Sequence, residues 1–121
     1  MAVAILYSDG LKEYDFGPGH SFRGDRYQVF SQFLTNNLPS ENNYHIIEAQ
    51  AATDDELLRI CDRDYIDFTR DFYKTANLGI QFDGQFYRYH SADNRPRGKC
   101  GKLEEAARLV IGQAKLAADL I

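Results

Sequence analysis

The stretch "AVAILY", Ala2 to Tyr7, decides how the fold of this chain is interpreted. It is a short apolar run without polar alternation, and a turn signal, "SDG", follows it directly. Runs of this kind are typical of a strand that is covered on both of its faces, as the strands of parallel sheets are. We therefore expect a buried parallel strand here.

A helix and a second strand follow. Apolar and aromatic residues recur at helical spacing from about Gly24 to Leu34, which predicts an amphipathic helix that ends before the polar segment "TNNLPSENN". The next run, "YHIIEA" (Tyr44 to Ala49), is typical of a strand. A strand, a helix and a strand in this order normally form a right-handed crossover between parallel strands, so the sequence predicts an α/β sheet.

The middle of the chain predicts two further helices. Thr53 and Glu56 have the spacing of a capping box, which indicates a helix start at Thr53. Asp62 can cap the next helix, whose apolar face holds aromatic residues between Tyr65 and Tyr73. The charged residues of that helix are expected to face water.

The remaining third combines a long loop with a final helix. Asp83-Gly84 stands between aromatic residues in "QFDGQF", which predicts a two-residue hairpin turn. No helical period is evident from there to "GKCG", and loops of this length are uncommon unless they bind something or are disordered. The alanine-rich run from Lys102 to Ile121 predicts a helix.

Composition and charge exclude several classes of protein. With 121 residues, of which 44% are hydrophobic and 26% charged, the chain is expected to form one domain over residues 1–121. The net charge of -4 offers no broad attraction for nucleic acid or anionic lipid, so we expect neither partner. No apolar run is long enough to span a bilayer and no secretory signal is evident, which predicts a cytoplasmic protein with reduced Cys61 and Cys100.

The loop "EYDFGPGHSFRGDR", Glu13 to Arg26, is the richest segment of the chain. Irregular loops between regular elements often carry recognition and chemistry, but this one lacks the glycine patterns of known phosphate-binding loops. His20 lies within it and could be a ligand, a proton carrier, or a side chain that only bonds its neighbouring backbone.

The residues alone do not assemble an active site. The chain has no H-x-x-x-H, C-x-x-C or D-x-H cluster, so no zinc site is predicted. His45 lies in a predicted strand and is expected to be structural, whereas the role of His90 in the long loop stays open. Cys61 has no local partner that would activate it as a nucleophile.

Four ordered blocks resemble the N-terminal part of the zinc-dependent histone deacetylase superfamily, especially its acetoin-utilization-type deacetylases. The blocks are "YDFGPGHSFRGDR", "ATDDELLRICDRDYIDF", "HSADNRP" and "LEEAARLVIGQAKLAADLI", and they cover nearly the whole chain. The resemblance implies the N-terminal portion of an arginase/deacetylase-like parallel-sheet fold, with about two parallel strands and four or so helices. It also implies a zinc-dependent amide hydrolase as the parent activity.

The resemblance implies that the glycine loop forms a wall of the substrate tunnel. It places Arg26 near an internal channel and Asp93 at the rim, where an aspartate holds the backbone amides of the acylated substrate. The implied substrate-binding residues are Phe16, Gly19, His20, Arg26 and Asp93. Two simpler interpretations stay open, because Arg26 can pair with a carboxylate and Asp93 can start a turn. If the tunnel interpretation holds, Gly19–Ser21 and Asp93 should lie together around a shared cleft.

Departures from the family pattern bear on activity. The zinc ligands and the transition-state tyrosine of the family fall beyond the point matching Ile121, so no catalytic or metal-binding residue is assigned in this chain. Ser21 and Gly24 replace two prolines, and Cys61 replaces a histidine. Whether the chain is an enzyme is left open, and we expect it to be inactive alone.

Two functions from different classes follow. The first is a deacetylase-like N-terminal domain or fragment that contributes tunnel loops as a complementing subunit or remnant, with a complementary deacetylase chain or a second copy as partner and no cofactor of its own. The alternative is a small non-enzymatic module that binds a peptide or ligand.

Overall fold

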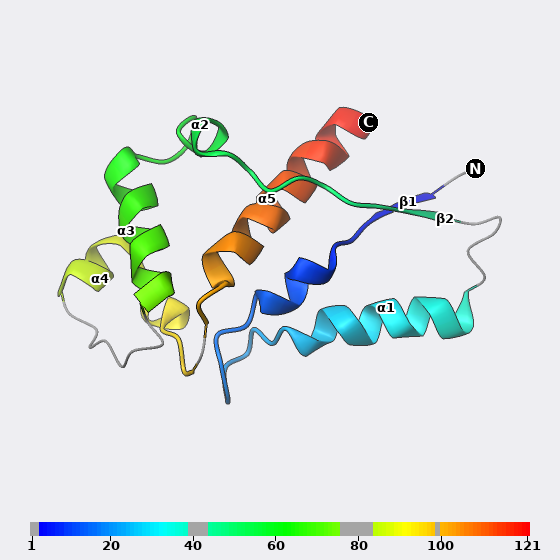
Figure 1. Ribbon diagram of the computed structural model, residues 1–121, viewed down its shortest axis with the longest axis horizontal. Helices are drawn as coiled ribbons and strands as arrows, with labels where there is room; N and C mark the ends of the chain where they lie inside the picture. The colour runs from blue at the N-terminus through cyan, green and yellow to red at the C-terminus, as the bar shows by residue number, and fades with distance from the viewer. Residues whose placement is uncertain (1–2, 39–43, 76–83, 99) are drawn as a thin grey trace.

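The computed structural model describes residues 3–38, 44–75, 84–98 and 100–121. Within these ranges two strands and five α-helices occur, with two short 3-10 helices between them (Figure 1). In chain order they are β1 (Val3–Leu6), η1 (Asp9–Glu13), α1 (Asp25–Asn37), β2 (Tyr44–Ile47), α2 (Asp54–Leu57), α3 (Arg63–Thr75), α4 (Gly84–Tyr89), η3 (Ala92–Asn94) and α5 (Leu103–Leu120). The predicted α/β class, with about two parallel strands and four or so helices, is confirmed.

The two strands pair in parallel, as the strand–helix–strand order predicted. Val3 lies opposite Tyr44 and Leu6 opposite Ile47, with α1 as the connection between the strands. The expectation that the first strand is covered on both faces is wrong, because Val3 is 52% exposed. The sheet has only two strands in the described residues, and α1 and α5 pack mainly on η1.

Helix α1 runs three residues further than the predicted end at Leu34. The polar residues that were expected to stop it bond to the helix itself: Thr35 donates to the Ser31 carbonyl at 3.1 Å and Asn37 to the Phe33 carbonyl at 2.9 Å. Such bonds to the preceding turn keep polar side chains compatible with a helix. Leu38 then has extended backbone dihedrals and ends the helix.

The capping box at the start of α2 is confirmed. The Glu56 amide donates to the Thr53 hydroxyl at 3.2 Å, and the Thr53 amide donates to the Glu56 carboxylate, also at 3.2 Å. These two bonds satisfy amide groups that have no partner within the helix. Because Leu57 at the end of this helix is buried, the cap also fixes where α2 packs.

The hairpin predicted at Asp83-Gly84 is wrong in its second half, which the structure describes from Gly84 onward. Residues 81–83 lie outside the described ranges, and Gly84–Tyr89 form helix α4 where a strand was expected. Just after the helix, the His90 amide donates to the Phe86 carbonyl four residues earlier at 2.9 Å, as in a helical turn. Phe86 is only 1% exposed, so helical spacing suits its burial.

Two hydrophobic clusters organise the interior. The larger one joins the glycine loop to helices α3, α4 and α5 through Phe16, Phe72, Tyr73, Phe86, Cys100 and Leu103. The smaller one lies beneath α2 and the start of α3 and contains Ala52, Leu57 and Ile66. The larger cluster therefore lies directly under the glycine loop.

None of the helices in the described ranges combines the length and apolar character that crossing a membrane requires.

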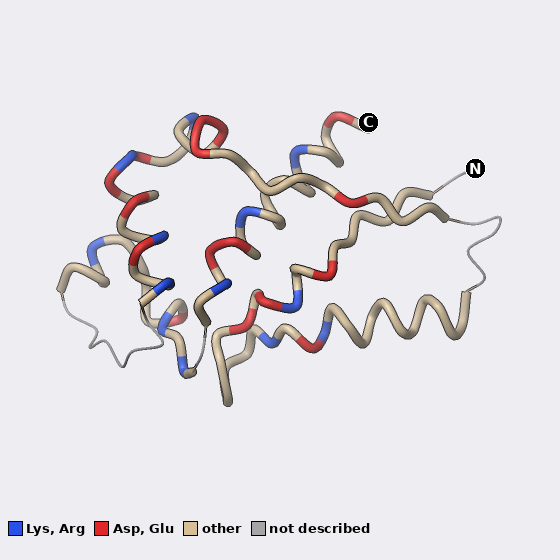
Figure 2. The backbone as a smooth tube through the Cα atoms, in the orientation of Figure 1, with Lys and Arg blue, Asp and Glu red and all other residues tan. Residues whose placement is uncertain are grey.

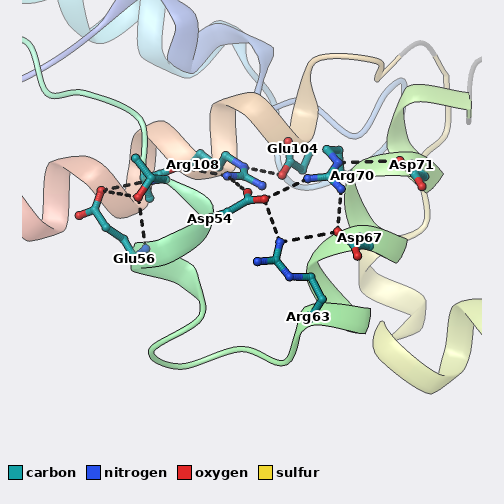
Figure 3. Close-up of polar contacts among 10 residues, drawn as sticks. Asp54, Glu56, Arg63, Asp67, Arg70, Asp71, Glu104 and Arg108 are labelled. Carbon is teal, nitrogen blue, oxygen red and sulfur yellow. Dashed lines mark hydrogen bonds and ion pairs between the residues drawn. The ribbon is translucent and has the colours of Figure 1, made fainter.

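The charged residues of α3 do more than face water. Asp54 of α2 accepts from Arg63 at 3.1 Å and Arg70 at 3.3 Å, and Arg108 of α5 lies 2.7 Å from its other oxygen (Figure 3). The hydrogen bond with Arg108 is the main cause that lowers the pKa of Asp54, despite partial desolvation. One carboxylate thus ties together three helices, α2, α3 and α5.

Candidate functional site

A single carboxylate shapes the glycine loop, which we call the first loop (residues 14–24). Asp15 Oδ1 accepts a hydrogen bond from the Gly17 amide at 2.8 Å, and Oδ2 accepts one from the Gly24 amide at 3.0 Å. The first bond is an Asx turn, in which an aspartate bonds the backbone two residues on. Asp15 was not among the predicted site residues, although the spacing Asp15-x-Gly17 is a signal that could have identified it.

Two glycines give the first loop its backbone course. Gly17 has φ of +101° and Gly19 has φ of +78°, in the region that other residues rarely adopt. A Cβ on Gly17 would lie 2.6 Å from the carbonyl carbon of Arg97 and 2.6 Å from the amide nitrogen of Gly98. Gly17 therefore permits close contact with residues 90–98, which we call the second loop.

Three hydrogen bonds join the two loops, which lie side by side near the lower edge of Figure 1. His20 Nε2 lies 2.5 Å from the Asp93 carbonyl oxygen across 73 positions of sequence. Arg97 contributes the other two, from its amide to the Phe16 carbonyl at 2.5 Å and from Nη1 to the Gly19 carbonyl at 2.9 Å. The predicted proximity of Gly19–Ser21 and Asp93 is present in the structure.

His20 acts as a bridge in this arrangement. Its Nδ1 accepts from the Phe22 amide at 3.0 Å, so Nε2 carries the proton that it donates to the Asp93 carbonyl. The ring also stacks on Phe16, with centroids 4.6 Å apart. With both nitrogens engaged, the imidazole bonds its own loop and the second loop together, which is the third of the roles that the sequence left open.

Phe16 anchors the first loop to the core. Its side chain is 1% exposed and meets Tyr14 and Tyr73 edge to face, at centroid distances of 5.6 Å and 6.3 Å. In this position Phe16 supports the loop from inside. Its implied contact with substrate stays a prediction.

Arg26 and Asp93 both lie at the surface. Arg26 donates to the Tyr27 hydroxyl at 3.1 Å and lies over the Phe22 ring at 5.6 Å, so within the described ranges its partners are aromatic side chains and not a carboxylate. The turn around Asp93 is closed by the Asn94 amide and the Ser91 carbonyl at 3.0 Å. Among the described residues, no hydrogen bond or ion pair engages the exposed Asp93 carboxylate.

Helix α3 holds the second loop from below. The Tyr73 hydroxyl donates to the Asn94 carbonyl at 2.7 Å, and burial strongly raises the pKa of Tyr73. His90 Nε2 lies 2.9 Å from the Thr69 hydroxyl, and burial lowers the pKa of His90. The role of His90, open from the sequence, is therefore that of a half-buried residue at the base of the loop.

An open depression of about 650 Å³ lies over the first loop. It is lined by Asp15, Arg23 and the residues of segment 17–21. Asp93 does not line this depression, which is formed by the first loop alone. The second loop is hydrogen-bonded beside it through Asp93. The two loops therefore lie together, but they do not share the walls of this depression.

The described residues do not fit a zinc ion. No group of three His, Cys, Asp or Glu side chains among them is placed to hold a metal. Cys100 is buried, which raises its pKa, and Cys61 is partly buried elsewhere. His45, expected to be structural, is an exposed residue of β2. No zinc-dependent step can therefore be assigned to these side chains, and the predicted absence of zinc stays a prediction.

Together, these features define an α/β protein in which two distant loops are bonded into one surface. The acetoin utilization protein AcuC of Staphylococcus aureus strain MRSA252 is 32% identical over 120 residues, and AcuC of strain MSSA476 is 31% identical. Each match covers 98% of the chain and 29% of the relative. No family model matches the chain. No solved structure matches it either.

The chain is homologous to AcuC, which confirms the resemblance to acetoin-utilization-type deacetylases. It spans less than a third of the length of these relatives, since the matched part is 29% of each.

We expect Gly17→Ala to disrupt the joint between the loops. The added methyl group would require φ of +101° and would meet the second loop at 2.6 Å, so unfolding should become easier by at least about 2 kcal/mol. Gly84→Ala is the matched control, because a Cβ there meets nothing within 4 Å. Urea denaturation of both variants tests this, and equal stabilities would contradict it.

Proposed function

We propose that this chain contributes two substrate-facing loops to a deacylase of the acetoin-utilization type and does not hydrolyse substrate with its own residues. One observation carries the proposal, namely the hydrogen bond between His20 and the Asp93 carbonyl. It holds an exposed carboxylate beside the first loop, as the resemblance implied for a substrate wall.

The contribution of these loops is binding and orientation. An exposed carboxylate accepts hydrogen bonds from two neighbouring amides of an extended peptide, and such charge-assisted bonds are stronger than neutral ones. The backbone of Asp93 is held by His20, and the next residue is held through the Asn94 carbonyl by Tyr73. Because the backbone of Asp93 and that of the next residue are fixed, the carboxylate is presented at little further entropic cost.

The proposed ligand is a peptide containing an acylated lysine. The exposed ring of Phe22 stands beside Tyr14, with ring centroids 6.1 Å apart, and supplies apolar surface for an acyl-lysine stem. Backbone amides on either side of the lysine would donate to Asp93. The alternative, a non-enzymatic interaction module, does not require the acyl group to be recognised.

We expect Asp93→Asn to weaken binding of an acetyl-lysine peptide about tenfold, because a charged hydrogen bond is worth about 1.5 to 3 kcal/mol. Fluorescence anisotropy with a labelled peptide measures the dissociation constant. Asp119→Asn, the same change at an exposed position of α5, is the control and should bind as the parent chain does.

A second peptide makes the test specific. Methylating the two backbone nitrogens beside the acetyl-lysine removes the donors, so the modified peptide should bind the parent chain and Asp93→Asn equally weakly. Equal binding of acetylated and unacetylated peptide would favour the interaction module instead. Zinc analysis and an acetyl-lysine hydrolysis assay complete the test, since one zinc per chain with activity lost on chelation would contradict the proposal.

A further inference from the structure

The second loop and the segments on either side of it hold a large share of the positive charge of the chain. Residues 88–102 contain five of the 14 Lys and Arg residues and a single acidic residue, Asp93. The whole chain has 18 acidic residues and a net charge of -4, so a basic segment stands here in an acidic protein. Figure 2 shows blue at several points of its described part, near the lower edge of the molecule. An anionic group that approaches the two loops therefore meets a local charge opposite in sign to that of the whole protein.

Arg97 is the residue of this segment that bonds the first loop at two points. Its backbone amide donates to the Phe16 carbonyl, and its Nη1 donates to the Gly19 carbonyl at 2.9 Å. The two bonds fix both the backbone and the charged end of the side chain. Because the guanidinium is already held in place, it loses little conformational freedom when it binds a further group.

The charge of Arg97 is left for a ligand. A guanidinium carries several N–H donors in a planar fork, and the bond to Gly19 uses one of them. Arg97 is exposed, and among the described residues no carboxylate lies within ion-pair distance of it, whereas Arg23 of the first loop is paired with Asp25. The acidic residue of the first loop, Asp15, has both oxygens bonded to backbone amides. A guanidinium with free donors binds carboxylates, often through two parallel hydrogen bonds.

Arg97 and Asp93 are held at adjacent positions of the first loop. Arg97 bonds the Gly19 carbonyl, and the Asp93 carbonyl bonds the ring of His20. An extended peptide advances about 3.3 Å per residue. A peptide whose backbone amides reach the Asp93 carboxylate therefore brings a side chain one or two residues from the acyl-lysine close to Arg97.

We infer that Arg97 is a specificity-determining residue, which gives the two loops a preference for peptides with an acidic residue within two positions of the acyl-lysine. The inference rests on the proposed function and narrows its substrate class. Asp93 binds the peptide main chain, whatever its sequence, whereas Arg97 binds the neighbouring carboxylate. The second loop thus supplies one contact to the backbone and one to a side chain.

Two peptides that differ in one functional group measure this preference. Each carries an acetyl-lysine, flanked on both sides by aspartate in one peptide and by asparagine in the other, so that their size and main chain are matched. At low ionic strength the parent chain should bind the aspartate peptide about fivefold more tightly, the upper range for an exposed ion pair. Added salt should reduce the difference, because it screens exposed charges. Fluorescence anisotropy gives both dissociation constants.

Arg97→Gln should bring the ratio of the two dissociation constants close to one. Glutamine can still donate to the Gly19 carbonyl, and any damage to the contact between the loops would weaken both peptides alike, so the ratio reports the charge. Arg97→Lys keeps the charge and should retain part of the preference. Arg59→Gln, which removes an exposed arginine just after α2, is the matched control and should keep the ratio of the parent chain.

Three results would overturn the inference: equal binding of the two peptides by the parent chain, a preference that survives in Arg97→Gln, or an equal loss of preference in Arg59→Gln. The proposed function can fail separately. If binding depends on Asp93 and on the acetyl group but the parent chain does not distinguish the two peptides, the function stands and the role of Arg97 is wrong. If the aspartate peptide is preferred through Arg97 equally with and without the acetyl group, the acidic preference stands and the substrate-wall function fails. If neither peptide binds, both are wrong.

Discussion

Phe16→Ala is expected to lower the free energy of unfolding by about 3 to 5 kcal/mol, the usual cost of truncating a buried aromatic residue. Phe16 is 1% exposed and joins the first loop to Tyr73 of α3 and to the stacked His20. Its removal leaves a cavity at the point where the two loops meet, so the loss should also weaken acetyl-lysine peptide binding. Urea denaturation followed by circular dichroism gives the stability change.

Phe22→Ala is the control for this prediction, because it makes the same chemical change in the same loop. Phe22 is 38% exposed and packs against Tyr14 and His20 from outside, so a loss of about 1 kcal/mol is expected. If both variants lose the same stability, Phe16 is not the anchor of the loop.

Arg108→Met is expected to cost about 3 kcal/mol, because it removes the cation beside the Glu104 carboxylate, whose side chain is 13% exposed, and leaves that buried charge without its arginine. The Arg108 side chain is 14% exposed and lies 2.5 Å from Glu104 and 2.7 Å from Asp54. Arg23→Met breaks a surface pair with Asp25, in which the Arg23 side chain is 67% exposed, and should cost about 0.5 kcal/mol or less. Similar losses in the two variants would contradict the structural role of Arg108.

The pH dependence of the Arg108 effect provides a second check. The bond from Arg108 lowers the pKa of Asp54, so Asp54 contributes stability above its unfolded pKa of about 3.9 and loses it as the pH falls through the lower folded pKa. The difference between the parent chain and Arg108→Met should therefore shrink below about pH 4. A difference that grows on acidification would contradict this assignment.

Local signals predicted the fold well. The capping box at Thr53 depends on residues three apart, and the parallel pairing of β1 with β2 follows from a strand–helix–strand order. Tertiary packing decided the features that were predicted wrongly. Asp83-Gly84 is a local turn signal, but the burial of Phe86 against Phe72 selects a helix after it. The exposure of Val3 depends on how many strands the sheet has, and the apolar stretch from Ala2 to Tyr7 carries no information on that number.

The candidate site was predicted only as far as the resemblance reached. It placed His20 and Asp93 together, and the structure joins them through a ring nitrogen and a backbone carbonyl. Which aromatic residue of the loop points inward depends on α3, so Phe16 could not be distinguished from Phe22 by sequence. The Asp15-x-Gly17 spacing was a local signal for Asp15, but its second amide partner, Gly24, lies nine residues away and becomes a neighbour only when the loop folds.

The central claim is that the two loops act as one substrate-facing surface. Titrating the ¹⁵N-labelled chain with an acetyl-lysine peptide, while recording amide chemical shifts, tests this claim most directly. The account predicts that amides of residues 17–23 and 91–97 shift together with one dissociation constant, and that the unacetylated peptide leaves them nearly unchanged. Shifts confined to one loop, or to α1 and the strands, would contradict it.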